Sequence, residues 1–236
     1  MWYAVIFFDV GNTLVRYAPS EEEQFLKRLA DSGYEGASVE DAHRMVIAAQ
    51  NAEYAQLLRE WRGETRLSDD AFFALQDCAA LQELLPREEA LTLLPALSVQ
   101  KRSYDGKQVL PEARMLLQKL KARGQRMGIV SNDTPRLKSF LEKNGLSEYF
   151  ETIVISGIVG VEKPDAHILR IALEQTKARA QDCLYVGDHP FDVLCAKTAG
   201  MHCAWIAPPQ ARLPEGLGAE EDFRINSVEE ILAWID

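Results

Sequence analysis

Residues 3–15 read YAVIFFDVGNTLV, and this stretch decides the fold. The run Tyr3–Phe8 is short, apolar and rich in Val, Ile and Phe, which is typical of a strand buried on both faces of a parallel sheet. Asp9 ends the apolar run, and a turn that contains Gly11 follows it. We therefore expect a buried first strand that carries an aspartate at its carboxyl end.

The N-terminal run lacks a basic leader and a small-residue cleavage site, so we interpret it as a strand and not as a signal peptide. No stretch approaches the ~18 apolar residues of a membrane span. The formal net charge of −10 disfavours binding to nucleic acid or to anionic membranes. We expect a cytoplasmic monomer or homodimer without such partners, in which Cys78, Cys183, Cys195 and Cys203 are reduced thiols, mostly buried.

Between about residues 20 and 100 the sequence has helical signals and almost no strand signals. Ser20, Ser38 and Ser68 each precede acidic residues, a pattern typical of a helix N-cap followed by carboxylates at the positive end of the helix dipole. Ala, Leu, Gln, Glu and Arg dominate, and all are good helix formers. The pattern predicts about four helices.

From Val109 onward, strand and helix signals alternate. The predicted strands are Met127–Val130, Thr152–Ile155, Cys183–Val186 and His202–Ile206, and the predicted helices are Pro111–Arg123, Pro135–Lys143, Asp165–Gln175, Phe191–Ala199 and Val228–Ile235. Such alternation predicts an α/β fold, with a doubly wound (Rossmann-like) parallel sheet. We expect a core formed by residues 1–16 and 105–236, interrupted by a helical domain formed by residues 17–104.

Polar side chains gather where the predicted strands end. Asp9, Ser131 and Asn132, and Asp188 follow three strands, and Lys163 follows a fourth through a loop. In open parallel sheets the active site lies at the carboxyl ends of the strands, so these groups are expected at one edge.

Asp188 and Asp192 are four residues apart at the start of a helix, which places them on one helical face. Together with Asp9 they offer the oxygen ligands that Mg²⁺ prefers. Lys163 would balance the cluster and lower the pKa of its carboxylates. This arrangement suits a carboxylate nucleophile, with the Ser131 hydroxyl holding the transferred group.

Four segments in this order resemble the motifs of the haloacid dehalogenase-like (HAD) hydrolase superfamily. They are Phe8-Asp9-Val10-Gly11-Asn12-Thr13-Leu14, Val130-Ser131-Asn132, Glu162-Lys163-Pro164-Asp165 and Val186-Gly187-Asp188 with Asp192. The insertion after the first motif resembles the members with an α-helical cap domain.

The resemblance implies a role for each matching residue. Asp9 would be the nucleophile, and Ser131 and Lys163 would join it in catalysis. Asn12, Thr13, Ser131, Asn132 and Lys163 would bind the substrate. Mg²⁺ would be the cofactor, held by Asp9, the Gly11 carbonyl, Asp188 and Asp192. The implied reaction is hydrolysis of a small phosphorylated metabolite.

Position 11 departs from the family pattern. Phosphatases of this superfamily carry a general acid–base aspartate two residues after the nucleophile, and here Gly11 has no side chain. Such help is typically worth ~10²–10⁴ in rate. Three alternatives therefore stay open: a 2-haloacid dehalogenase, a phosphonatase that uses a cap lysine such as Lys27 or Lys101, and a weakly active regulatory or binding protein.

Several of these residues also have plainer interpretations. Lys163 could be a surface lysine, Asp188 a helix cap, Asp192 an exposed helical carboxylate and His189 a solvent-facing loop residue. In the cap, Tyr54, Trp61, Phe72 and Phe73 are expected to pack between helices. Arg16, beside the cap boundary, is expected to be solvated.

Overall fold

The computed structural model describes residues 3–98 and 106–235 and divides the chain into two compact units. The first comprises residues 1–16, 107–209 and 217–236, and the second comprises residues 17–106 and 210–216. Each has its own hydrophobic core. The domain boundaries expected from the sequence stay a prediction, and the one at residues 104 and 105 lies outside the described residues.

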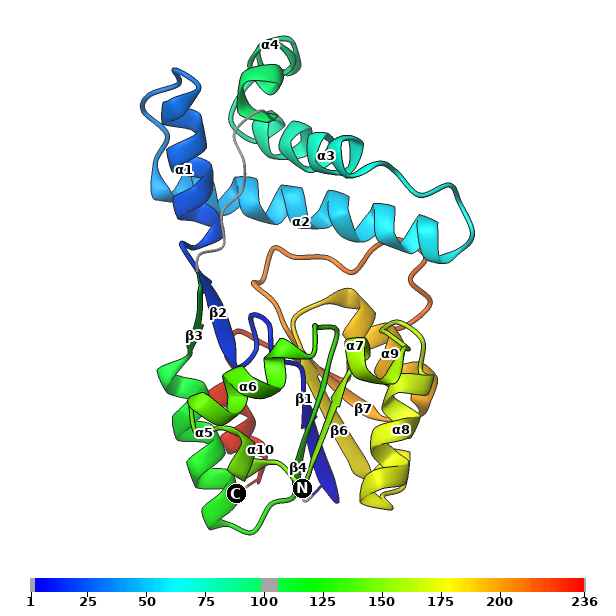
Figure 1. Cartoon of the computed structure of the whole chain (residues 1–236). Helices are drawn as coiled ribbons and strands as arrows, with labels where there is room; N and C mark the ends of the chain where they lie inside the picture. The colour runs from blue at the N-terminus through cyan, green and yellow to red at the C-terminus, as the bar shows by residue number, and fades with distance from the viewer. Residues whose placement is uncertain (1–2, 99–105, 236) are drawn as a thin grey trace. The chain divides into compact units, whose positions relative to one another are not determined.

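The first unit is built on a six-stranded sheet with the order β5-β4-β1-β6-β7-β8, in which every pair is parallel. Its strands are β1 (Val5–Phe8), β4 (Met127–Ser131), β5 (Thr152–Ile155), β6 (Cys183–Gly187), β7 (His202–Ile206) and β8 (Phe223–Ile225), of which Figure 1 labels β1, β4, β6 and β7. β1 lies between β4 and β6, so the first motif occupies the middle of the sheet. The predicted α/β fold with an inserted helical segment is confirmed.

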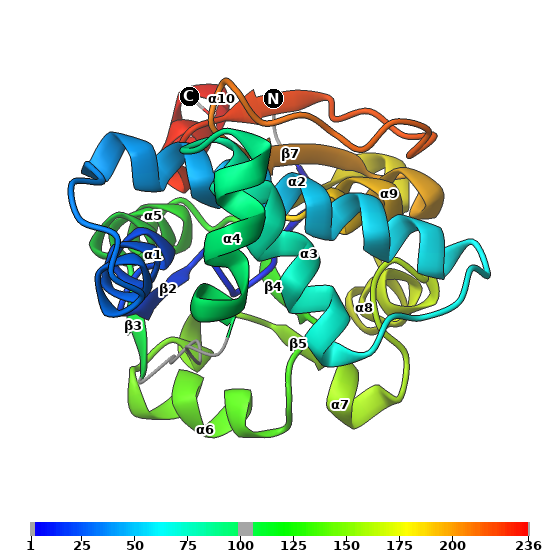
Figure 2. The same ribbon diagram turned by 90° about the horizontal axis from the view of Figure 1, so that it is seen from above.

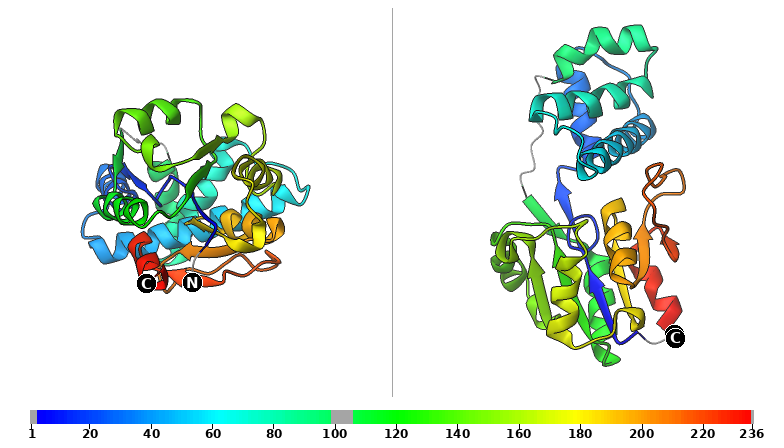
Figure 3. Two further views of the ribbon diagram at one scale, coloured as in Figure 1. Left: turned by 90° about the horizontal axis from the view of Figure 1, so that it is seen from below. Right: turned by 90° about the vertical axis from the view of Figure 1, so that its right-hand side faces the viewer.

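Helices cover both faces of this sheet because successive side chains of a strand point to opposite faces. Ile6 and Phe8 belong to a core cluster that also includes residues of α5 (Pro111–Ala122), α6 (Arg136–Lys143) and the short helix η3 (Val228–Ile231). On the other face, α8 (His167–Thr176) contacts β4 and β5, and α9 (Pro190–Ala199) contacts β6 and β7. Figure 3 gives two further views of these layers. The remaining short elements are η1 (Ser147–Tyr149), α7 (Ser156–Val159), η2 (Ala180–Asp182) and α10 (Leu232–Ile235).

The second unit contains the four predicted helices, α1 (Glu21–Asp31), α2 (Val39–Trp61), α3 (Asp69–Gln82) and α4 (Arg87–Ser98). Ser20, Ser38 and Ser68 are N-caps, and each side chain accepts a hydrogen bond from a backbone N–H of its helix. α2 packs against α1 and α3, and α4 packs against α3, as Figure 2 shows from above. The predicted starts of α1, α2 and α3 are therefore confirmed.

Three short strands were not predicted. β2 (Val15–Ala18) and β3 (Gly106–Val109) pair in a separate two-stranded sheet, and β8 adds a sixth strand to the main sheet. β2 and β3 have only four residues each, with polar side chains among them, so their sequence carries no clear periodic signal. Arg16 in β2 is exposed and hydrogen-bonds Gln108 of β3.

Within the described residues, no helix is long and apolar enough to cross a membrane. All four cysteines are free thiols, and Cys183, Cys195 and Cys203 are buried. Burial raises the pKa of Cys183 to about 11 and that of Cys195 to about 12, so both thiols stay protonated at neutral pH.

Candidate functional site

The predicted site residues meet at the carboxyl edge of the sheet. Asp9 directly follows β1, and its backbone N–H donates to the carbonyl of Val186 in the neighbouring β6. Ser131 is the last residue of β4, and Asp188 comes directly after β6. Because β4 and β6 flank β1 in parallel register, these three positions share one edge of the sheet (Figure 1).

Lys163 lies at the centre of the site. Its Nζ is 2.7 Å from Asp9 Oδ1, 2.6 Å from Asp192 Oδ1 and 3.0 Å from the Tyr185 hydroxyl. Only 5% of the Lys163 side chain is exposed, so the interpretation as a surface lysine is wrong. Burial alone would lower the pKa of this ammonium group, but Asp192 and Asp9 outweigh burial and raise the pKa well above its usual value. The group therefore stays charged.

Asp192 is fully buried, so the interpretation as an exposed helical carboxylate is also wrong. Its Oδ2 accepts a hydrogen bond of 2.9 Å from the backbone N–H of His189, the N-cap of α9. Gly187 makes room for this carboxylate, because a Cβ at position 187 would lie 2.2 Å from Asp192 Oδ2. Asp192 thus joins Lys163 to the first turn of α9.

Asp9, Asp188 and Asp192 form a group of carboxylates whose oxygens lie within 4.8 Å of one another, close enough to hold one metal ion. These three carboxylates face one ammonium group, so negative charge is in excess. Burial, followed by the charges of Asp9 and Asp192, raises the pKa of Asp188 well above its usual value. Burial also raises the pKa of Asp9 and outweighs the lowering by Lys163, so the predicted net lowering does not occur at Asp9.

The turn after Asp9 supplies two further polar residues. Asn12 has a positive φ of 48°, a conformation that asparagine tolerates better than most residues, and its side chain hydrogen-bonds the Asp188 carboxylate. Thr13 is 1% exposed, and its hydroxyl has no hydrogen-bond partner among the described residues.

Asn132 holds the backbone of Lys163 at both of its polar groups. The Asn132 Nδ2 donates to the Lys163 carbonyl at 2.9 Å, and the Lys163 N–H donates to Asn132 Oδ1 at 2.8 Å. This pair of bonds ties the end of β4 to the segment that carries the lysine.

The sequence reasoning overlooked Tyr185 as a site residue. It lies within β6, is fully buried, and its hydroxyl contacts Lys163 Nζ while donating to the Val130 carbonyl at 2.7 Å. Its place within a predicted buried strand was a signal that could have identified it, because a buried phenol needs a hydrogen-bond partner. His189 was expected to face solvent, but its ring is half-buried and Nδ1 accepts a bond from the Phe191 N–H. His189, and not Asp188, caps α9.

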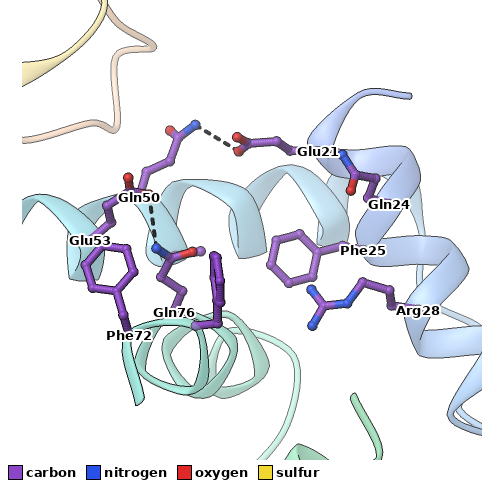
Figure 4. Close-up of a pocket in the computed structure, with 10 residues that line it drawn as sticks. Glu21, Gln24, Phe25, Arg28, Gln50, Glu53, Phe72 and Gln76 are labelled. Carbon is purple, nitrogen blue, oxygen red and sulfur yellow. Dashed lines mark hydrogen bonds between the residues drawn. The ribbon is translucent and has the colours of Figure 1, made fainter. Parts of the chain in front are cut away.

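The helical unit has a pocket of its own, with a volume of ≈ 160 Å³. Figure 4 shows Phe25, Phe72 and three glutamines around it, with Glu53 Oε2 accepting from Gln76 Nε2. Beside it, Arg28 and Asp77 form a buried ion pair between α1 and α3.

Two of the four cap aromatics expected to pack between helices line this pocket, namely Phe72 and Phe73. Tyr54 is buried, whereas the Trp61 side chain is about half exposed.

Comparison with known proteins gives a family and several relatives. The sequence model of the haloacid dehalogenase-like hydrolase family matches residues 3–200 of this chain. A phosphoglycolate phosphatase of Rhodospirillum rubrum is 31% identical over 216 residues, covering 91% of this chain and 84% of that protein. A phosphoserine phosphatase of Thermus thermophilus is 32% identical over 146 residues, covering 61% of this chain and 57% of that protein.

The solved structures include the HAD-hydrolase YfnB from Bacillus subtilis bound to magnesium, with a TM-score of 0.60 and 19% identity over the full length of both chains. At this identity the likeness concerns the fold. The family match covers most of the chain and includes Asp9, Ser131, Lys163, Asp188 and Asp192. The chain therefore belongs to the haloacid dehalogenase-like hydrolases.

Proposed function

We propose that this protein is a Mg²⁺-dependent phosphatase that acts on a small phosphorylated metabolite through an aspartyl-phosphate intermediate on Asp9. The observation that carries the proposal is the buried group of Asp9, Asp188 and Asp192 around the single ammonium of Lys163. The relatives named phosphoglycolate phosphatase and phosphoserine phosphatase support the substrate class.

The donor set fits Mg²⁺, which prefers carboxylate and carbonyl oxygens and neutralises excess negative charge. Asp9, Asp188 and the Gly11 carbonyl would hold the ion, and Asp192 would contribute its charge while keeping Lys163 in position. When bound, Mg²⁺ would neutralise charge on the transferred phosphoryl group.

The remaining roles follow from the contacts of each side chain. The Asp9 carboxylate attacks phosphorus, and the Lys163 ammonium, already 2.7 Å from Asp9 Oδ1, stabilises the negative charge of the phosphoryl oxygens. The hydroxyls of Ser131 and Thr13 donate to the same oxygens. The unpartnered Thr13 hydroxyl supports this role, because a buried hydroxyl without a partner costs free energy that a bound acceptor would recover. Asn132 orients Lys163 through the lysine backbone.

A second candidate is a regulatory protein that binds Mg²⁺ and an anion but turns over slowly. The observation that favours it is Gly11, which offers no side chain where phosphatases of the family carry their general acid and base. The other two alternatives have less support. Asp188 gives the site the third carboxylate of a metal cluster, which a metal-independent dehalogenase does not need. Lys27 is exposed and paired with Asp31, and Lys101 lies outside the described residues.

The test is a hydrolysis screen over phosphorylated metabolites and 2-haloacids, with Mg²⁺ and with EDTA, beside Asp9→Asn. Mg²⁺-dependent phosphate release that Asp9→Asn abolishes would support the phosphatase. Halide release in EDTA would contradict the phosphatase and show that the protein is a metal-independent dehalogenase. Mg²⁺ binding without turnover of any substrate would favour the regulatory protein.

A further inference from the structure

Position 11 offers no side chain that could donate a proton to a leaving group, because it is a glycine. Gly11 lies in a tight turn in which the N–H groups of Leu14 and Val15 both donate to the Val10 carbonyl, at 2.9 and 3.0 Å. Gly11 also forms an isolated bridge with Val15. What this position presents to a substrate is backbone N–H and C=O alone.

Lys163, Tyr185 and His189 lie near Asp9 and can carry a proton, but each already makes other contacts. The Lys163 ammonium donates to Asp9, Asp192 and Tyr185. The Tyr185 hydroxyl donates to the carbonyl of Val130. His189 Nδ1 accepts the Phe191 N–H and so caps α9, and this nitrogen would have to give up that bond to carry the proton of an imidazolium acid. Each of these groups would have to break a buried contact before it could protonate a leaving group.

From this arrangement we propose that the substrate is an acyl phosphate, a mixed anhydride whose leaving group is a carboxylate that departs without a proton. The proposal rests on the proposed function and specifies its substrate class. A general acid contributes typically ~10²–10⁴ in rate when the leaving oxygen is strongly basic. A carboxylate leaving group is stable as an anion, so a site without that acid handles it at no disadvantage.

The two chemical steps then balance without an acid. An Asp9 carboxylate oxygen forms a bond to phosphorus while the bond from phosphorus to the substrate carboxylate oxygen breaks, and that oxygen keeps the bonding electron pair. Water then attacks phosphorus, the bond to Asp9 breaks, and the proton lost by water goes to solvent. The products are a carboxylate and inorganic phosphate. The leaving group of the second step is the Asp9 carboxylate itself, which also needs no proton.

A leaving-group series in wild-type protein tests the proposal. With Mg²⁺ present, kcat/KM is measured for acetyl phosphate, p-nitrophenyl phosphate, phenyl phosphate and glycerol phosphate. The expected result is a steep fall along this series, with glycerol phosphate slower than acetyl phosphate by at least about 10²-fold, the usual contribution of a general acid. Glycerol phosphate within about tenfold of acetyl phosphate would overturn the proposal, because another group would then supply the proton.

Gly11→Asp and Gly11→Asn form a matched pair, because the two side chains are similar in size and only the carboxyl group can carry the proton. We expect Gly11→Asp to raise the glycerol phosphate rate about 10²-fold relative to Gly11→Asn. If the two variants behave alike while folded, the proposal fails. Should either fail to fold, the wild-type series decides alone.

The proposed function fails in a different way from this inference. If no compound in the series, acetyl phosphate included, gives Mg²⁺-dependent phosphate release that Asp9→Asn abolishes, the phosphatase itself is excluded. If all compounds are hydrolysed at similar rates, the phosphatase stands and the substrate class does not.

Discussion

Lys163 and Asp9, which are 154 positions apart in the sequence, form a buried ion pair in which the Lys163 Nζ lies 2.7 Å from Asp9 Oδ1. The same ammonium group contacts Asp192 Oδ1 at 2.6 Å. One lysine therefore compensates two buried carboxylates from different parts of the chain, and its removal should affect both stability and chemistry.

Replacing Lys163 with Gln should destabilise the metal-free protein by about 3–5 kcal/mol, because it leaves two buried carboxylates without their counter-charge. Urea unfolding measures this difference. Mg²⁺ should restore part of the lost stability, since it would bind Asp9 and supply positive charge near Asp192. Lys121→Gln is the control, because Lys121 pairs with Glu148 at the surface, where such pairs contribute about 0–1 kcal/mol. Equal losses in the two variants would contradict the account.

Asn132→Ala should lower activity about 10–100-fold, which is the usual effect of losing a hydrogen-bonded partner that orients a functional residue. The reason is that Asn132 holds both backbone polar groups of Lys163. Steady-state kinetics on any hydrolysed substrate measure it, and the loss should appear mainly in kcat. Asn144→Ala serves as control, because the Asn144 side chain donates to the Phe140 carbonyl of α6, the helix that Asn144 caps at its C-terminus, and not to Lys163. A variant with unchanged kcat would show that Lys163 does not need this support.

Gly187→Ala should displace the Asp192 carboxylate, because the added Cβ would lie 2.2 Å from Asp192 Oδ2. We expect a loss of stability of about 1–3 kcal/mol, as for other overpacked sites, together with weaker Mg²⁺ binding by calorimetry. The same substitution at Gly106, where a Cβ would meet nothing within 4 Å, should change stability by less than about 0.5 kcal/mol. Unaltered Mg²⁺ affinity in Gly187→Ala would show that the Asp192 carboxylate does not contribute to Mg²⁺ binding.

Stabilisation by Mg²⁺ should increase as the pH rises above ~3.9, the pKa of an aspartate in the unfolded chain. The pKa values of Asp188 and Asp9 are raised in the metal-free protein, whereas an aspartate in the unfolded chain titrates near ~3.9. At pH values between the unfolded pKa and the raised native pKa, the native state binds more protons than the unfolded state. The stability of the metal-free protein therefore falls as the pH rises through this range. Mg²⁺ competes with those protons for the two carboxylates, so the loss of stability at higher pH should not occur in the Mg²⁺-bound protein.

Thermal unfolding with and without Mg²⁺ at several pH values measures this effect as a difference. The difference is needed because His189 acts in the opposite sense. Burial lowers its pKa to about 3, so the stability it contributes is lost as the pH falls. Asp188→Asn should reduce the Mg²⁺-dependent shift. A shift that is the same at every pH would contradict the raised carboxyl pKa values.

The strand–helix order, the inserted helices and the meeting of Asp9, Ser131 and Asp188 could be predicted from the sequence. Continuous apolar runs, N-cap serines and the rule that site residues follow parallel strands are local or topological signals. The strands β2, β3 and β8 could not be predicted, because in three or four residues that include polar side chains no apolar run stands out from a loop.

The burial of individual site residues was harder to predict than their position along the chain. The sequence does not distinguish a buried helix face from an exposed one at Asp192, and only the tertiary structure shows that Lys163 and Gly187 enclose its carboxylate. Tyr185 was missed because its place in a buried strand indicates that the phenol needs a hydrogen-bond partner but does not identify Lys163 as a contact. Both depend on a partner that is distant in sequence.

The most direct test of the central claim is to look for the phosphoryl group on Asp9 itself. The protein is incubated with acetyl phosphate and Mg²⁺, quenched in acid and digested, and its peptides are analysed by mass spectrometry. The account predicts one phosphoryl group on the peptide that contains Asp9, and none in Asp9→Asn or in EDTA. Phosphate release without any label at Asp9, or with the label retained in Asp9→Asn, would contradict an aspartyl-phosphate intermediate at this residue.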